Sequence, residues 1–215
     1  MQHSIAWIGM IAMVSLTISL SAGEPTRVVF LGDSLTAGYG LTPDQAYPAL
    51  LEQALRRAGY EVTCINAGLS GDTTAGGVRR LDWLLRQPVD LLVVALGAND
   101  ALRGFPVEHT EKNLQAIMDE VQARQPTARV LLLGMLAPPN LGVRYGNAFV
   151  GMYRSLATHP VVIGFMPFLL KGVAGVAAYN QADGVHPTAE GQRMIASEVL
   201  PYVKAALAPV RMDGP

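Results

Sequence analysis

The chain has 215 residues, half of them hydrophobic, and its formal net charge is −1. This length fits a single domain with a sizeable core. The basic residues are scattered, so the sequence has neither the basic stripe of a nucleic-acid-binding protein nor an acidic tail. The single cysteine, Cys64, excludes an intrachain disulfide and any metal site built from several cysteines. Because Cys64 falls in a predicted strand, we expect it to be buried and inert.

Residues 1–23 are interpreted as a secretory signal peptide. The segment 5–20 carries no charge and is followed by small residues around Ala22 and Gly23, as at a cleavage site. An uncleaved membrane anchor is the alternative, but the segment is shorter than the roughly 20 apolar residues that span a bilayer. We therefore expect a mature chain that begins near Gly23 or Glu24 and is periplasmic or secreted.

The rest of the chain alternates short apolar runs with amphipathic segments. Five runs are predicted to be strands: 27–31, 60–68, 89–97, 128–136 and 160–166. The run 89–97 is the most apolar, which favours the central strand of a parallel sheet. Helices are predicted at 43–59, at 78–87, along the face formed by Leu114, Ile117, Met118 and Val121, and from about Pro187 to Leu207, with Pro187 near the first helical position.

This alternation predicts an α/β fold of the doubly wound type. Helices on both faces of a parallel sheet of about five strands give a three-layer sandwich. The sequence contains no internal repeat or linker, so residues 24–210 are expected to form one domain. In open sheets of this kind the ligand binds at the carboxyl ends of the strands, near the point where the strand order reverses.

Small and polar residues follow the predicted strands at that end. The first run leads directly into Asp33 and Ser34, the second into the segment 66–73, and the third into the segment 97–100. The segment 183–187 lies just before the last helix. Because the carboxyl ends of parallel strands meet at one edge of a sheet, these four segments are predicted to converge on one site.

Ser34, His186 and Asp183 are a candidate catalytic triad. A serine hydroxyl becomes a nucleophile only when a base takes its proton, and His186 is the natural base. Asp183, three residues earlier, can hold the imidazole in the required tautomer. The nucleophile elbow G-x-S-x-G is absent, so the scaffold differs from that of the α/β-hydrolases. Taken one at a time, Ser34 could instead cap a helix and Asp183 could form a loop turn.

Donors for a developing oxyanion are also present. Gly71 can offer a backbone N–H, Asn99 can offer a side-chain amide, and Ser34 can add its own backbone N–H. Asp33 is expected to brace the turn after the first strand through hydrogen bonds. The alternative for Gly71 and Asn99 is a purely local role in their turns.

Four segments in this order resemble the blocks of the SGNH (GDSL) hydrolase family: GDSL at 32–35, SGDT at 70–73, GAND at 97–100 and DGVH at 183–186. The stretches NAGLSGDTTAGG and PPNLGVRYGNAF resemble its multifunctional periplasmic thioesterase, arylesterase and lysophospholipase group. The resemblance implies a flavodoxin-like fold with Ser34 as nucleophile, Gly71 and Asn99 as oxyanion donors, and Asp183 with His186 completing the triad. Such a triad needs no cofactor, and the sequence has no histidine cluster for a metal.

Apolar residues after the third and fourth predicted strands could form an acyl-binding groove. The candidates are Leu102, Phe105, Pro138, Leu141 and Tyr145, with Phe149 further along. They could instead simply pack beneath long loops. The expected activity is hydrolysis of acyl or aryl esters or thioesters, with lysophospholipids among the candidates. The expected partner is a small-molecule substrate of a monomer, with no nucleic acid and no stable protein partner.

Three other functions are considered. A carbohydrate acetylesterase on the same fold would need polar walls in place of the apolar loops. A nucleotide- or phosphate-binding α/β protein is disfavoured, because neither G-x-x-x-x-G-K-[ST] nor G-x-G-x-x-G follows the first strand. A non-catalytic lipid-binding protein on this fold would be expected to have lost a triad member, and the sequence retains all three.

Overall fold

The structure is a computed structural model, and it describes residues 24–208 of the chain. The predicted signal peptide, 1–23, lies outside the described residues. Five strands form one parallel sheet in the order β2-β1-β3-β4-β5. They are β1 (Thr26–Gly32), β2 (Val62–Gly68), β3 (Leu91–Ala95), β4 (Arg129–Leu133) and β5 (Val162–Met166). The predicted doubly wound fold is confirmed, with β3 in the centre.

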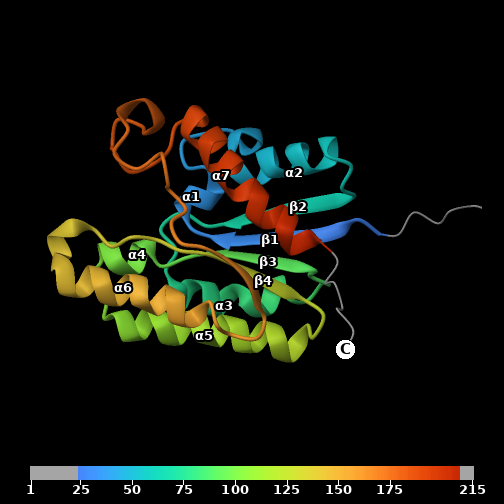
Figure 1. The fold of residues 1–215 in the computed structure, drawn as a ribbon, viewed down its shortest axis with the longest axis horizontal. Coiled ribbons are helices and arrows are strands. Elements are labelled where there is room, and N and C mark those ends of the chain that lie inside the picture. Colours follow the sequence, from blue (N-terminus) through green and yellow to red (C-terminus); the bar gives the residue numbers. More distant parts are fainter. Residues whose placement is uncertain (1–23, 209–215) are drawn as a thin grey trace, which may run out of the picture.

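Helices cover both faces of this sheet (Figure 1). On one face α2 (Tyr47–Arg57) packs against α7 (Ala189–Leu207), and on the other α5 (Val107–Arg124) packs between α3 (Thr74–Leu84) and α6 (Gly142–Leu156). The short helices are α1 (Ser34–Ala37), α4 (Ala98–Leu102) and the 3₁₀ turns Pro43–Gln45, Pro139–Leu141 and Ala177–Tyr179. Within residues 24–208, no helix has the length and apolar character needed to cross a membrane.

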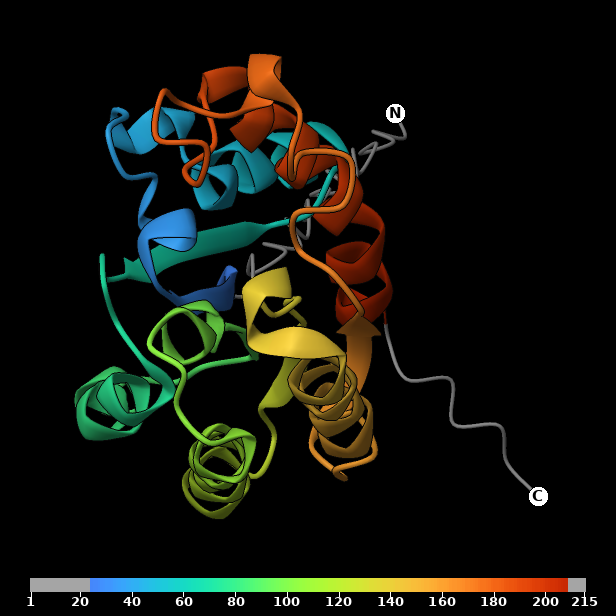
Figure 2. The same ribbon diagram turned by 90° about the vertical axis from the view of Figure 1, so that its left-hand side faces the viewer.

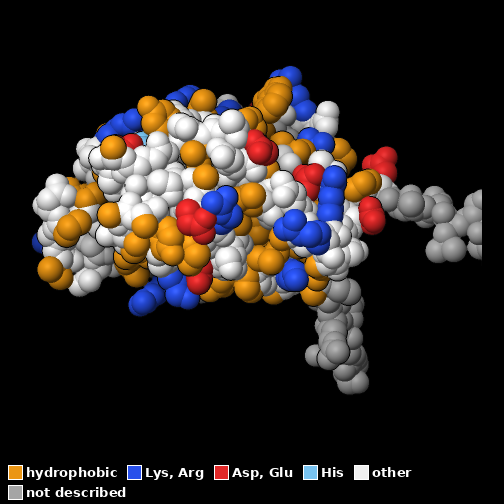
Figure 3. Space-filling model, turned by 90° about the horizontal axis from the view of Figure 1, so that it is seen from above, with side chains coloured by type: hydrophobic (Ala, Val, Ile, Leu, Met, Phe, Trp, Pro, Cys, Tyr) orange, Lys and Arg blue, Asp and Glu red, His pale blue; other side chains and the backbone are white. Residues whose placement is uncertain are grey.

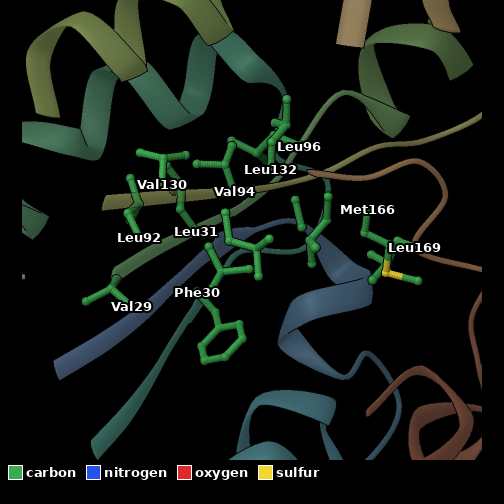
Figure 4. Packing of buried hydrophobic residues seen from close by; sticks show 14 of the residues in the cluster. Val29, Phe30, Leu31, Leu92, Val94, Leu96, Val130, Leu132, Met166 and Leu169 are labelled. Carbon is green, nitrogen blue, oxygen red and sulfur yellow. The ribbon is translucent and has the colours of Figure 1, made fainter. Parts of the chain in front are cut away.

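The core lies on both faces of the central strands. Residues of β3 are buried along its whole length, as expected for a strand covered by helices on both sides. In β1, Phe30 packs edge-on against Tyr47 of α2, with 5.7 Å between ring centroids. Its neighbour Leu31 points to the opposite face, where it approaches Leu96 (Figure 4). This alternation of side chains fixes β1 between the two helical layers.

Charges of both signs are interspersed on the face that carries α2 and α7. Figure 3 shows blue and red side chains singly or in small groups among hydrophobic ones. The two helices of this face carry ion pairs, Arg56 with Glu52 on α2 and Arg193 with Glu190 on α7. Exposed pairs of this kind contribute little to stability, so the fold depends on its core.

Helix α6 was not predicted from the sequence. The residues after the fourth predicted strand are interpreted from the sequence as an apolar loop. The structure shows a helix whose buried residues are Phe149, Met152, Tyr153 and Leu156. Their spacing is that of one helical face, and the burial of this face against the sheet outweighs the low helix propensity of glycine.

Three helix starts also differ from the predictions. Helix α2 begins at Tyr47, four residues after the predicted start, because residues 43–45 form a separate 3₁₀ turn. Helix α7 begins at Ala189, not near Pro187, because the Thr188 hydroxyl caps it by accepting from the Gly191 N–H at 3.2 Å. Helix α3 begins at Thr74, four residues before the predicted start, and Thr73 caps it. Gly76 in its first turn leaves room for Asp72, since a Cβ there would lie 1.6 Å from a carboxylate oxygen.

The arrangement places the site at the switch point of the sheet. β1 and β3 are neighbours, and the chain leaves them toward opposite faces. Figure 2 looks onto this end, where α1, α4 and the loop that leads into α7 come together. Gly97 makes the exit from β3 possible, because its φ of +120° is one that side-chain-bearing residues rarely adopt.

Candidate active site

Ser34 is the first residue of α1, directly after β1. Asp33 caps this helix: its Oδ1 accepts a hydrogen bond from the Leu35 N–H at 3.0 Å. The capping role that Ser34 could have taken therefore belongs to Asp33, as does the predicted brace of the turn. The Ser34 hydroxyl instead lies 3.0 Å from Nε2 of His186.

His186 and Asp183 share one tight turn before α7. Asp183 Oδ2 lies 2.7 Å from His186 Nδ1. Its Oδ1 accepts from the backbone N–H groups of Val185 at 2.9 Å and His186 at 3.0 Å. Asp183 thus has both roles considered from the sequence, since one oxygen forms the turn and the other holds the imidazole.

The charge of Asp183 sets the tautomer of His186. Hydrogen bonds from the His186 backbone N–H, from its imidazole and from the Val185 N–H lower the pKa of Asp183 to about 2. The carboxylate is ionised at neutral pH and can only accept hydrogen bonds. The proton of a neutral imidazole therefore sits on Nδ1, and Nε2 is free to accept the proton of Ser34.

The three predicted oxyanion donors line one cavity: Ser34, Gly71 and Asn99. Among the described residues, the backbone N–H groups of Ser34 and Gly71 have no hydrogen-bond acceptor of suitable geometry. One amide hydrogen of Asn99 points to Asp33 Oδ2, with 3.3 Å between the heavy atoms. An amide has two hydrogens, so the second remains for a ligand. All three groups can therefore donate into the cavity.

Arg80 holds the loop that carries Gly71. Its Nε contacts Asp72 Oδ2 at 2.7 Å, and its two terminal nitrogens donate to the carbonyl oxygens of Ala67 at 2.6 Å and Gly32 at 2.9 Å. One guanidinium thus ties the ends of β1 and β2 to the loop before α3. Sequence reasoning missed this residue, because nothing in the spacing from Asp72 to Arg80 indicates a contact.

Asp33 is a buried carboxyl group beside the site, with 1% of its surface exposed. Burial raises its pKa to about 6, although the hydrogen bonds from the Leu35 N–H and the Asn99 amide oppose this shift. Because it contacts both the α1 turn and Asn99, it links the part of the site that carries Ser34 to the part that carries Asn99.

The cavity has a volume of about 410 Å³. Of the predicted groove residues, Leu102 and Pro138 lie in its lining, whereas Phe105, Leu141 and Tyr145 do not. Leu141 packs against the core. The Tyr145 ring stacks on the fully buried Phe149, and its hydroxyl donates to the Phe105 carbonyl at 2.7 Å. These aromatic residues therefore join α6 to the loop after α4.

Several lining residues were not predicted: Tyr39, Met135, Leu136, Leu170 and Val185. Met135 and Leu136 were placed inside the fourth strand, but β4 ends at Leu133 and leaves them at its carboxyl end. Leu170 follows β5 within an apolar run, so the rule used for the other strands would have found it. The ring of Tyr39 packs on that of His186, with 4.5 Å between centroids, and no sequence pattern indicates this contact.

Neither a metal site nor a reactive thiol is apparent in the part of the chain that the structure describes. Between residues 24 and 208, no group of three His, Cys, Asp or Glu side chains is placed to hold a metal ion. Cys64 is half-buried in β2, and burial raises the pKa of its thiol to about 12. The thiol is therefore protonated at neutral pH, although Cys64 is less buried than predicted.

The chain is similar to a family of lipases and acylhydrolases and to several esterases. The GDSL-like lipase/acylhydrolase family matches residues 30–194. The esterase TesA of Pseudomonas aeruginosa is 40% identical over 93% of this chain and 96% of its own. Thioesterase 1/protease 1/lysophospholipase L1 of Escherichia coli K12 is 37% identical over 86% of this chain and 85% of its own. The crystal structure of AlinE4, an SGNH-hydrolase family esterase, is 44% identical over 88% of this chain and 100% of its own, with a TM-score of 0.71.

The raised pKa of Asp33 predicts a specific pH dependence of stability. The carboxyl group ionises near pH 3.8 in the unfolded chain and near 6 in the folded one, so the folded state holds the proton longer. Its contribution is fully present below pH 3.8 and is lost as the pH rises through 6, by about 3 kcal/mol in total. Urea unfolding of the wild type and of Asp33→Asn at pH 4 and pH 8 measures this contribution to the free energy of unfolding.

For each protein, the free energy of unfolding at pH 8 is compared with that at pH 4. A loss of stability in Asp33→Asn that is the same at both pH values therefore cancels. We expect the stability of the wild type to fall relative to the variant between the two pH values. Asp44→Asn, which removes an exposed carboxyl group, is the matched control. Parallel stability profiles for the wild type and Asp33→Asn would contradict the prediction.

Proposed function

The chain belongs to the GDSL-like lipase/acylhydrolase family and is a carboxylic ester hydrolase, and from that premise we propose that Ser34, His186 and Asp183 form its catalytic triad. The observation that carries the proposal is the hydrogen-bonded path from Asp183 through His186 to Ser34 at the edge of an apolar cavity. The substrates are carboxylic esters and thioesters, cleaved through an acyl-enzyme.

Acylation begins at the Ser34 hydroxyl. Its Oγ attacks the carbonyl carbon while Nε2 of His186 takes its proton. The resulting imidazolium is stabilised by the ionised Asp183, which keeps its charge because its pKa is about 2. The 3.0 Å and 2.7 Å contacts of His186 are within the range expected of a nucleophile, a base and an orienting carboxylate.

The carbonyl oxygen gains negative charge in this step. The N–H groups of Ser34 and Gly71 and the free amide hydrogen of Asn99 receive it. These donors are fixed before substrate arrives, because Asp33 holds Asn99 and Arg80 holds the loop of Gly71. Donors that need no rearrangement stabilise the transition state more than the ground state, and this difference accelerates the reaction.

Breakdown of the tetrahedral intermediate uses the same groups in reverse. His186 gives its proton to the leaving alcohol, phenol or thiol, and the acyl group remains on Ser34. Water then enters, His186 takes one of its protons, and the hydroxide attacks the acyl carbon. The bond to Ser34 Oγ breaks, His186 returns the proton to Ser34, and the carboxylic acid leaves.

The lining of the cavity indicates that the enzyme recognises the acyl group of its substrate. Next to Ser34 its walls include Leu102, Met135, Leu136 and Leu170 from three different segments. Apolar walls with a few placed donors suit a hydrocarbon chain ending in a carbonyl group. A carbohydrate acetylesterase would need polar walls for a sugar, so the lining favours acyl esters over this alternative.

The names of two relatives indicate the range of leaving groups. One is called an esterase, and the other is called a thioesterase, a protease and a lysophospholipase. We propose the same breadth for thioesters, aryl esters and lysophospholipids, because the donors and the apolar walls act on the acyl part of the substrate and not on its leaving group. All groups of the proposed site come from one chain, so a monomer suffices.

We also propose that the enzyme is exported, to the periplasm or the medium, with residues 1–23 removed. The uncharged segment 5–20 and the small residues after it support this. Esters are then hydrolysed outside the cytoplasm.

The first prediction concerns the nucleophile. In hydrolysis of p-nitrophenyl esters from acetyl to palmitoyl, Ser34→Ala is expected to lower kcat by at least about 10³-fold, because the Ser34 hydroxyl is the one hydrogen-bonded to His186 among the described residues. The exposed Ser155 on α6 offers a control, since Ser155→Ala should keep wild-type rates. A folded Ser34→Ala variant with rates near wild type would exclude this serine as nucleophile.

The second prediction concerns the cavity wall. Leu136 is 47% exposed at the cavity, so Leu136→Trp adds bulk there without overpacking the core. Each methylene kept out of an apolar wall loses about 0.8 kcal/mol. The ratio of kcat/KM for octanoyl over acetyl ester should therefore fall at least about tenfold.

Val143→Trp is the matched control for this experiment, because Val143 is 80% exposed on α6 and lies outside the cavity lining. An octanoyl-to-acetyl ratio unchanged in Leu136→Trp would mean that the acyl chain binds elsewhere.

The third prediction concerns export. Mass spectrometry of the protein from a periplasmic or culture-medium fraction should give an N-terminus near Gly23 or Glu24. An intact N-terminus retained in the membrane fraction would support the anchor interpretation instead.

A further inference from the structure

The side-chain amide of Gln181 lies between the two parts of the proposed triad. Its Nε2 donates to the carbonyl oxygen of Tyr39 at 2.7 Å and to that of Pro187 at 2.9 Å. Tyr39 follows shortly after Ser34 in the chain, and Pro187 directly follows His186. One amide group therefore contacts both the segment of the nucleophile and the segment of the base.

The backbone of Gln181 also shapes the turn that holds Asp183 and His186. Its N–H donates to the His186 carbonyl at 2.7 Å, and its carbonyl accepts from the Gly184 N–H at 2.9 Å. The residues just outside this pair, Asn180 and Pro187, form an antiparallel bridge. The turn is thus closed by its own hydrogen bonds, which hold Asp183 and His186 in one local unit.

The contact with the nucleophile segment is close. Gly40 lies against Gln181, since a Cβ on Gly40 would come within 2.6 Å of Gln181 Oε1. Beside it, the Tyr39 ring packs on the His186 imidazole at 4.5 Å. The position of His186 relative to Ser34, 152 residues apart in the chain, therefore depends on how this turn is held against residues 39 and 40.

We propose that Gln181 is a positioning residue, which sets the distance between His186 Nε2 and Ser34 Oγ by clamping the turn 180–187 to the segment after α1. This rests on the proposed function of the triad. Gln181 does not line the substrate cavity, so it acts through His186 and not on the substrate. A displacement of the base by about 1 Å can cost about 10²-fold in rate while leaving substrate binding intact.

Asn180 provides a matched control in the same turn. Its side-chain amide also donates to two carbonyl oxygens, those of Val173 at 2.7 Å and Val176 at 2.8 Å. Both acceptors belong to the loop before the turn and neither lies in the nucleophile segment. Asn180→Leu therefore removes as many hydrogen bonds as Gln181→Met, but it leaves the contacts of the Gln181 amide with Tyr39 and Pro187 in place.

The experiment measures kcat, KM and Tm for both variants with p-nitrophenyl butyrate. Gln181→Met should lower kcat by about 10- to 100-fold with KM within about twofold of wild type. Asn180→Leu should lower Tm by a similar amount but keep kcat within about threefold. A folded Gln181→Met variant with wild-type kcat, or an equal loss of kcat in Asn180→Leu, overturns the inference.

Gln181→Glu is the second test variant, to be used if Gln181→Met does not fold. Its ionised carboxylate has no donor and repels the two carbonyl oxygens, whereas the protonated form regains one O–H donor. The ratio of its kcat to that of wild type should be low at pH 8 and rise toward pH 5. A ratio near one at pH 8, or a deficit that does not change with pH, overturns the inference.

The outcomes separate this inference from the proposed function. A wild type that hydrolyses the ester and loses activity in Ser34→Ala, but not in Gln181→Met, overturns the positioning role alone. A folded wild type that is inert on every ester overturns both.

Discussion

The buried carboxyl group of Asp33 is the constraint on which the site depends. One oxygen caps α1 at the end of β1, and the other holds Asn99 at the end of β3. These strands are neighbours at the switch point, so a single side chain fixes Ser34, the proposed nucleophile, relative to Asn99, a proposed oxyanion donor. Its burial makes ionisation costly, which raises its pKa. The geometry therefore combines a precise site with a local loss of stability, as is common where function requires buried polar groups.

The proposed base, His186, is placed by different contacts. His186 and Asp183 belong to one turn whose hydrogen bonds are nearly all local, so their mutual geometry needs little from the rest of the fold. Their distance from Ser34 is a tertiary property, since the turn is placed by α7 packing on α2 and by Gln181. The site thus consists of two rigid parts that are brought together by long-range contacts. Such preorganisation lets the donors and the base act without rearrangement during the reaction.

The differences between the sequence predictions and the structure have physical causes. Apolar residues after a strand can face a cavity or the core, and the sequence does not separate the two. Leu102 and Pro138 face the cavity, whereas Tyr145 turns to stack on Phe149 in the core. Helix α6 was not predicted, although its buried residues have helical spacing. Pro187 lies before the α7 cap because a hydroxyl at Thr188 is the better partner for the first free N–H groups.

The sequence by itself determined the fold class, the order of strands along the chain and the identity of the three triad candidates. Hydrophobic periodicity is a local property, and a strand buried on both faces must be apolar throughout, as residues 91–95 are. Tertiary structure alone decided which helix-capping and bracing role each polar residue has, which apolar residues form the cavity, and how Arg80, Tyr39 and Gln181 support the site. These roles rest on contacts between residues far apart in the chain, which depend on the packing of the whole domain and leave no periodic pattern in the sequence.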